Sequence, residues 1–459
     1  MKNIRYIIAT FSVFVCLQAS VAQTAISSYF LDGTLYNSKI NPAMKAERGY
    51  FSPLVGNLSL RTNGNVGISN FLYPRGENEL TTFMSGTVNA DEFLNKLPSE
   101  ARFGFKLDET ILGAGFRLLG GYASLDLSLH SAAALSLPKG LFEFAKRGLQ
   151  KNSYSFSGLN INTMNYAAIT VGYSHNIFKG FRLGANLKYL VGLAHANVFV
   201  DKLNVELNDQ HWLVESHAQM QAALFCEATP TLDENNVING IKFGKMMPSS
   251  SGFAVDLGFV YDMDSIVPGL KLSGSITDLG YISWGHMMSG QSTDTRVEFN
   301  GFGELDYEDV EGSVNAELER LGTDASKMIE FNYDGANVMN TELNSTMYLG
   351  AEYSMPFYKP LSVAVLYSQC FSDFACYDWY EARGFINVAP LKWLEMSVNC
   401  GYGTYGTSFG WMLNFHPAGF NLFIGSDYMI TKVTPQFIPV DNMNAHITLG
   451  LNIALGKRK

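Results

Sequence analysis

Residues 390–428 carry the pattern that most restricts the fold, because apolar side chains recur there at every second position over three short runs. In the middle run one face carries Phe409, Trp411, Leu413 and Phe415. The opposite face carries Gly410, Met412 and Asn414. Since successive side chains of a strand point to opposite sides, we expect antiparallel strands with one apolar face and one polar or small face. Short turns containing Pro or Gly, at 389–392 and 416–419, separate the runs as hairpins require.

Such a sheet belongs either to a soluble sandwich or to a barrel whose apolar face meets lipid, and composition favours the barrel. Charged residues make up 16% of the chain, whereas soluble domains carry about 25%. The 43 glycines and the 13% of aromatic residues also fit a barrel. Its outer face must be apolar, aromatic rings favour the membrane interfaces, and glycine relieves crowding on a curved sheet.

Residues 1–22 have the features of a secretory signal peptide. Lys2 and Arg5 precede an apolar run at 6–17, and small residues at 20–22 form a cleavage site before Gln23. No later segment approaches about 18 consecutive apolar residues, the length of a membrane-spanning helix. We therefore expect an exported protein that crosses the cell outer membrane with strands.

Charge and cysteine content exclude other classes of protein. The formal net charge of −10 argues against a nucleic-acid partner. The four cysteines after the signal peptide are too few for a disulfide scaffold, and none forms a C-x-x-C pair. Cys370 and Cys376 flank an expected loop, and the sequence is compatible both with a disulfide between them and with two free thiols.

Connection lengths support an outer-membrane barrel. Sixteen segments have strand patterns: 53–69, 102–118, 122–136, 165–176, 180–195, 197–208, 211–226, 252–262, 269–282, 346–355, 360–371, 380–389, 391–402, 405–416, 418–429 and 445–455. With the C-terminus on the periplasmic side, that rim receives only short connections: 119–120, 177–179, 209–210, 263–268, 356–359, 390 and 417–419. The other rim receives the long ones: 70–101, 137–163, 227–251, 283–345, 372–379 and 430–444, with only 403–404 and a bend near 196 short. Short turns on one rim and long loops on the other are typical of such barrels.

We therefore divide the mature chain into a plug segment, 23–49, and a barrel, 50–459. The plug segment lacks strand periodicity, and Asn41-Pro42 reads as a turn. Because a barrel of 14 or more strands encloses more space than its side chains fill, we expect this segment to occupy the lumen. Short helices are expected at 91–97 and 138–149 in extracellular loops. Residues 286–345 are expected to form a long acidic extracellular loop that contains an amphipathic helix at 314–328.

Charged residues on the expected inward faces are the candidate binding residues: Arg117, Asp126, Lys188, Asp256, Lys271, Glu352 and Glu395. On the strand expected at 122–136, the inward face carries Ser124, Asp126, Ser128 and His130. Charges of both signs on a lumen face either brace the barrel or line a polar path. The sequence leaves both alternatives open.

We expect no enzymatic activity, no cofactor and no metal. The eight histidines show no zinc-like spacing. The glycine patterns at 401–406 and 406–410 resemble phosphate-binding and nucleophile-elbow motifs, but no helix is expected after either. A hydrolase whose serine, histidine and aspartate converged from separate strands would leave no pattern in the sequence.

Three stretches resemble known families. Asn41-Pro42-Ala43 resembles a segment of the long-chain fatty-acid transporter family. Residues 252–284 contain Asp-Leu-Gly at 256–258 and at 278–280, and they resemble the barrel core of PorV-like and PorP-like Bacteroidota proteins of secretion and gliding systems. Residues 118–148 together with 36–43 are similar to a Bacteroidota outer-membrane family without assigned function.

The resemblance implies a barrel of about 14 strands, within a range of 14–16, with an N-terminal lumen plug. It implies a channel or transporter for small hydrophobic molecules. The alternative is a non-transporting outer-membrane adaptor or anchor for secretion or surface machinery. The expected partners are accordingly outer-membrane lipid, together with either a hydrophobic small molecule or secretion-system and surface proteins.

Overall fold

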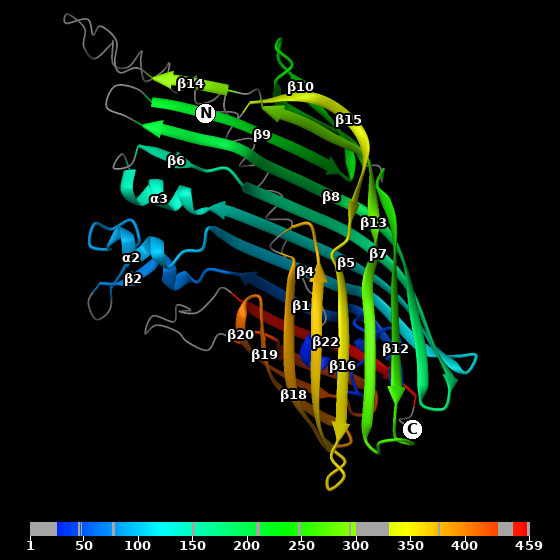
Figure 1. The fold of residues 1–459 in the computed structure, drawn as a ribbon. Coiled ribbons are helices and arrows are strands. Elements are labelled where there is room, and N and C mark those ends of the chain that lie inside the picture. The colour runs from blue at the N-terminus through cyan, green and yellow to red at the C-terminus, as the bar shows by residue number, and fades with distance from the viewer. Residues whose placement is uncertain are drawn as a thin grey trace, which may run out of the picture.

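Fourteen strands form a closed antiparallel barrel (Figure 1). The computed structural model describes residues 25–44, 46, 48–75, 79–148, 152–207, 212–246, 249–292, 295–299, 330–374, 377–429 and 444–456. The ring runs β1 (Gly49–Gly64), β4 (Glu100–Leu118), β5 (Gly121–Pro138), β7 (Leu159–Phe178), β8 (Phe181–Leu207), β12 (Ser251–Asp262), β13 (Leu270–Ser292), β16 (Ser345–Ser354), β17 (Leu361–Phe371), β18 (Trp379–Leu391), β19 (Leu394–Gly403), β20 (Gly406–Phe415), β21 (Phe420–Ser426) and β22 (Ala445–Leu455). β22 pairs with β1 and closes the ring.

The ring has fourteen strands and not the expected sixteen, for two reasons. Two expected strands are one strand, β8, and the strand expected at 211–226 does not belong to the ring, because β8 pairs directly with β12. Residues 180–195 and 197–208 form one strand of 27 residues, β8. The small side chains near Ala196 interrupt the apolar alternation, but the ladder from β8 to β7 continues through this position. The residues near 196 therefore do not form a turn between two strands. The connection after β8 consequently lies on the rim of the long loops.

Several of the expected long loops carry strands that extend the wall beyond the barrel (Figure 1). β9 (Trp212–Leu224) corresponds to the strand expected at 211–226, but it lies beyond the ring, where it pairs with β8 on one side and with β13 and β14 (Thr295–Phe299) on the other. β6 (Ser153–Ser155) also joins β8, and β15 (Phe331–Glu342) joins β13. Separate hairpins are formed by β10 (Cys226–Leu232) with β11 (Ile238–Met246), and by β2 (Leu72–Pro74) with β3 (Leu80–Thr82). Residues 227–251 thus contain a two-stranded hairpin, and parts of 286–345 near its two ends are strands.

The structure has short α-helices in two of the long connections, α2 (Ala90–Asn95) and α3 (Lys139–Arg147). A 3-10 helix, η3 (Ile68–Asn70), precedes β2. The helix expected at 314–328 and the signal peptide expected at 1–22 lie outside the described residues. In the described part of the chain, no helix is both long and apolar enough to cross a membrane.

The barrel wall has the two faces that the alternation predicts. On β20, Phe409 and Leu413 point outward and are 48% and 41% exposed. Met412 and Asn414 point inward and are 1% and 0% exposed. A row of large apolar side chains on the outer surface is the feature that a lipid-facing wall requires.

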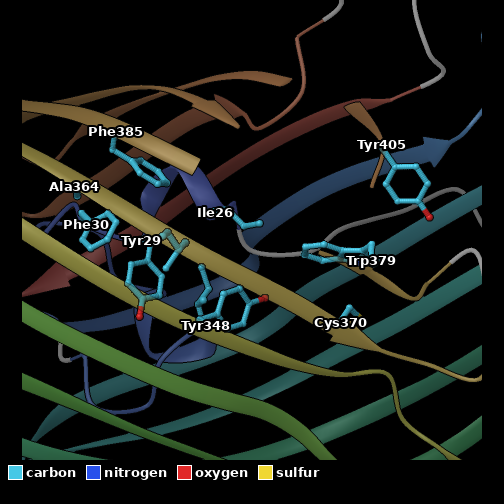
Figure 2. Packing of buried hydrophobic residues seen from close by; sticks show 11 residues of the cluster. Ile26, Tyr29, Phe30, Tyr348, Ala364, Cys370, Trp379, Phe385 and Tyr405 are labelled. Carbon is cyan, nitrogen blue, oxygen red and sulfur yellow. The ribbon is translucent and has the colours of Figure 1, made fainter. Parts of the chain in front are cut away.

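Residues 25–44 contain two 3-10 helices, η1 (Ile26–Ser28) and η2 (Asn37–Lys39), and contact inward-facing side chains of the wall. Short polar side chains form hydrogen bonds with backbone groups in the turns of this segment. For example, the Asn37 amide donates to the Leu31 carbonyl at 2.8 Å. Figure 2 shows Tyr29 and Phe30 of this segment against the inner wall. The Phe30 ring meets the Phe385 ring edge-on, with centroids 5.1 Å apart.

Candidate functional site

The first half of the N-terminal segment, residues 25–36, is held by two carboxylates of the barrel. The Asp427 carboxylate accepts from the backbone N–H of Ile26 at 2.9 Å and from that of Ser27 at 2.7 Å. It also accepts from the Ser27 hydroxyl at 2.6 Å. Glu395 accepts from the backbone N–H of Gly33 at 2.9 and 3.1 Å. Glu395 was expected to face the lumen, whereas Asp427 has no signal in the sequence because it follows the end of β21.

The second half, residues 37–44, is held through the Asn41-Pro42 turn. The Asn41 amide donates to the carbonyls of Phe259 at 3.1 Å and Gly274 at 3.3 Å, and its oxygen accepts from Ala43 N–H at 3.0 Å. Two glycines make room for the turn. A Cβ at Gly184 would lie 2.2 Å from the Pro42 carbonyl carbon, and one at Gly258 would lie 2.2 Å from Asn41 Oδ1. The glycine of the first Asp-Leu-Gly unit thus admits the turn.

The six charged candidates at Arg117, Asp126, Lys188, Asp256, Lys271 and Glu352 fall into two groups. Asp126, Lys188 and Asp256 line a cavity of about 120 Å³ beside Lys39, which we call the inner cavity. Its wall residues lie midway along β4, β5 and β12 and in the first third of β8. Its remaining lining includes Asp108, Ser128, His130, Tyr166 and Asp278.

The other three candidates line a second cavity of about 440 Å³, which we call the rim cavity. Arg117, Lys271 and Glu352 lie near strand ends at the rim of the short turns. Lys271 Nζ lies 3.1 Å from Glu352 Oε2 and 3.6 Å from Asp32 Oδ1 of the N-terminal segment. The segment therefore borders a cavity on each of two sides.

Lys188 joins the aspartates of both Asp-Leu-Gly units. Its Nζ lies 2.7 Å from Asp256 Oδ1 and 2.7 Å from Asp278 Oδ1. Asp256 is fully buried. This arrangement was not expected, because strict alternation places Asp278 on the opposite face from the inward-facing Thr277.

A β-bulge explains the inward position of Asp278. The register between β12 and β13 shifts between Val255 and Leu257, and Asp278 has a φ of 60° in the left-handed region. Its backbone N–H donates to Asp256 Oδ1 at 2.8 Å. Because a bulge places two residues opposite one, Asp278 joins Thr277 on the inner side.

Lys39 is a further residue of the inner cavity that the sequence did not single out. It lies on η2, and its ammonium donates to the Thr110 hydroxyl of β4. Burial lowers the pKa of Lys39, while the negative charges of Asp126 and Asp108 oppose this effect. No periodic pattern covers residues 37–44, so only the folded segment reveals that this lysine enters the cavity.

Ser128, His130 and Asp108 form a hydrogen-bonded chain in the same cavity. Ser128 Oγ lies 2.8 Å from His130 Nε2, and His130 Nδ1 lies 2.5 Å from Asp108 Oδ1. The alternation on β5 places Ser128 and His130 on one inward face. The pairing of β4 with β5 brings Asp108 opposite His130. This third partner could not be found from the sequence.

Among the described residues, no three His, Cys, Asp or Glu side chains are arranged to hold a metal ion. Cys226, Cys370 and Cys400 are free thiols. Cys376, the other member of the considered disulfide, lies outside the described residues.

Solved structures of outer-membrane channels are similar to this chain. The toluene transporter TodX of Pseudomonas putida has a TM-score of 0.40 and 8% identity, over 91% of this chain and 93% of that chain. A TodX mutant described as a monoaromatic hydrocarbon channel has a TM-score of 0.43 and 11% identity, over 92% and 94%. A FadL homologue of Pseudomonas aeruginosa has a TM-score of 0.35 and 8% identity, over 95% and 98%.

No curated protein sequence matches the chain. A model described as "Family of unknown function (DUF5723)" matches residues 42–427. This match covers most of the barrel and begins at Pro42 of the Asn41-Pro42 turn. The chain therefore belongs to the DUF5723 family.

Proposed function

We propose that this protein is an outer-membrane channel for small molecules in which residues 25–44 act as a plug. The observation that carries the proposal is the set of hydrogen bonds from this segment to residues on several sides of the closed ring. Asp427 and Glu395 hold one end, and the carbonyls of Phe259 and Gly274 hold the other. A ring of 14 strands needs such filling, because its own side chains leave the lumen open.

The apolar outer wall supports a location in the outer membrane, with lipid as the surrounding partner. The resemblance in the sequence implies a hydrophobic solute. The chemistry of the inner and rim cavities instead favours a solute that carries polar groups, because charged side chains such as Lys188 and Lys271 line them. We therefore test both solute classes.

The test compares the full chain with a variant that lacks residues 25–44, both reconstituted in lipid vesicles. We expect the deletion to raise the uptake of small sugars and amino acids several-fold, because it empties the lumen. A matched control carries Tyr358→Ala in an exposed turn and should behave as the full chain. Unchanged uptake by a deletion variant that inserts and folds normally would exclude the plug role. Faster uptake of toluene than of the polar solutes would favour the hydrophobic class.

A second candidate function, an adaptor for secretion or surface machinery, is favoured by the strands beyond the barrel. Apolar side chains on β11 and β15 are exposed there, including Phe243, Met246 and Val338. Large apolar side chains that are exposed together often mark a surface that contacts another protein. If this function holds, removing the hairpin 226–246 should impair export of surface proteins in cells without changing vesicle permeability.

A further inference from the structure

The inner cavity holds a serine, a histidine and an aspartate in one hydrogen-bonded line. Ser128 and His130 are two residues apart on β5 and therefore point to the same side of the wall. Asp108 lies directly opposite His130 in the ladder between β4 and β5. The separations of 2.8 Å from Ser128 Oγ to His130 Nε2 and 2.5 Å from His130 Nδ1 to Asp108 Oδ1 are hydrogen bonds.

In the neutral form of His130, the contact with Asp108 fixes the direction of both hydrogen bonds. A carboxylate only accepts, so the His130 proton that points at Asp108 resides on Nδ1. Nε2 is then the accepting nitrogen, and the Ser128 hydroxyl donates to it. This is the arrangement in which a histidine can remove the proton of a serine while an aspartate holds the ring.

The imidazole of His130 is also held on its face. The Tyr166 ring stacks on it with centroids 4.7 Å apart and an interplanar angle of 12°. Tyr166 lies opposite His130 in the ladder between β5 and β7. His130 is thus positioned from both neighbouring strands, as a general base must be before a substrate arrives.

A cation contacts the residue that lies opposite the serine in the ladder. Thr110 is paired with Ser128 across β4 and β5, and the Lys39 ammonium donates to the Thr110 hydroxyl. An ammonium carries three N–H donors, and Thr110 accepts from one of them. Fixed donors and positive charge next to a serine stabilise the negative oxygen that forms when the serine attacks a carbonyl.

The three residues border a cavity inside the lumen, where Ser128 is 3% exposed. Ser128, His130, Asp108 and Lys39 all line the inner cavity of about 120 Å³. The side chains of His130 and Asp108 are each 23% exposed. The volume restricts access to compact molecules and excludes long acyl chains from the cavity itself.

We propose that Ser128, His130 and Asp108 form a catalytic triad that hydrolyses small carboxylic esters inside the lumen. Ser128 Oγ attacks the ester carbonyl while His130 takes its proton, and Lys39 stabilises the resulting oxyanion. The C–O bond to the alcohol then breaks, and the alcohol leaves with the proton from His130. Water attacks the acyl-serine with His130 as base, which releases a carboxylic acid and restores Ser128.

This activity goes beyond the proposed passage of solutes and does not depend on it. The test uses the purified full chain in detergent micelles with two probes, a fluorophosphonate and p-nitrophenyl acetate. We expect covalent labelling at Ser128, located by mass spectrometry of the labelled peptide, and steady release of p-nitrophenol. Ser128→Ala should abolish both, and Asp108→Asn should lower the rate on the order of 10²–10⁴-fold because the histidine loses its orientation.

The matched control is Ser136→Ala, which removes another inward-facing hydroxyl of β5 that lies outside the inner cavity. It should keep labelling and hydrolysis unchanged. Folding of every variant is checked by its heat-dependent mobility on gels. Absence of labelling at Ser128 in folded full chain, or labelling only at another residue, would overturn the proposal. An equal loss of activity in Ser136→Ala would also overturn it.

Discussion

The two halves of the N-terminal segment enter the same lumen but are anchored by different chemistry. Residues 25–36 are held by the carboxylates of Asp427 and Glu395, and their aromatic side chains pack against β16–β18. Residues 37–44 are held at the neutral Asn41 amide, with the Lys39 ammonium on Thr110 and the Arg182 guanidinium on the Ala43 carbonyl as further contacts. They border the polar inner cavity. Because hydrogen bonds to charged groups contribute more than neutral ones, the Asp427 anchor should hold its half more firmly than the Asn41 anchor holds the other. One segment thus combines a charged anchor at one end with a neutral anchor beside the inner cavity at the other.

The largest effect is expected in the wall of the inner cavity, beside residues 37–44. Replacing Lys188 by Met leaves the buried Asp256 and its neighbour Asp278 without their cation. Loss of one partner of a buried ion pair should lower the free energy of unfolding by about 3–5 kcal/mol. Urea titration in lipid vesicles measures this change. Adding Asp256→Asn and Asp278→Asn to Lys188→Met should restore much of the stability, because no unpaired charge then remains. If Lys188→Met alone is as stable as the wild type, the two aspartates do not need the Lys188 cation.

The anchor of the first half should give the next largest effect. Asp427→Ala removes the acceptor of the Ile26 and Ser27 N–H groups, and we expect a loss of about 3 kcal/mol. Hydrogen exchange followed by mass spectrometry should show faster exchange in residues 25–36 and little change in 37–44. Uniform acceleration over both halves would mean that they do not differ in anchoring.

The anchor of the second half should be weaker. Asn41→Ala removes the bonds to the carbonyls of Phe259 and Gly274, with an expected cost of about 1–2 kcal/mol. Here faster hydrogen exchange should be confined to residues 37–44. If this variant proves less stable than Asp427→Ala, the ranking of the two halves is reversed.

The smallest effect concerns the contact between the halves. The Tyr29 hydroxyl lies 3.3 Å from the Asn41 amide nitrogen and 3.1 Å from Ser273 Oγ. Tyr29→Phe removes these bonds and keeps the ring, so we expect a loss of about 1 kcal/mol. Thermal unfolding followed by near-ultraviolet circular dichroism measures it. A loss as large as that of Asp427→Ala would indicate that the halves act as one unit.

The sequence by itself determined the two faces of the wall and the class of fold. The alternation around Phe409, Leu413 and Asn414 is local, and its period of two fixes which side chains meet lipid. It also separated the aperiodic residues 23–49 from the strands. The inward positions of Asp126, Lys188 and Asp256 followed from the same rule.

Tertiary structure decided what depends on pairing between distant strands. The bulge in β13 turns Asp278 inward, and the register between β4 and β5 places Asp108 opposite His130. The hydrogen bond from the Ile26 N–H to Asp427 joins residues that are far apart in the chain. The continuity of β8 through Ala196 is likewise set by its ladder to β7. Alternation records only which side of its own strand a residue occupies. Register, bulges and closure depend on hydrogen bonds to residues far away in the chain, and these bring the side chains of the inner cavity together.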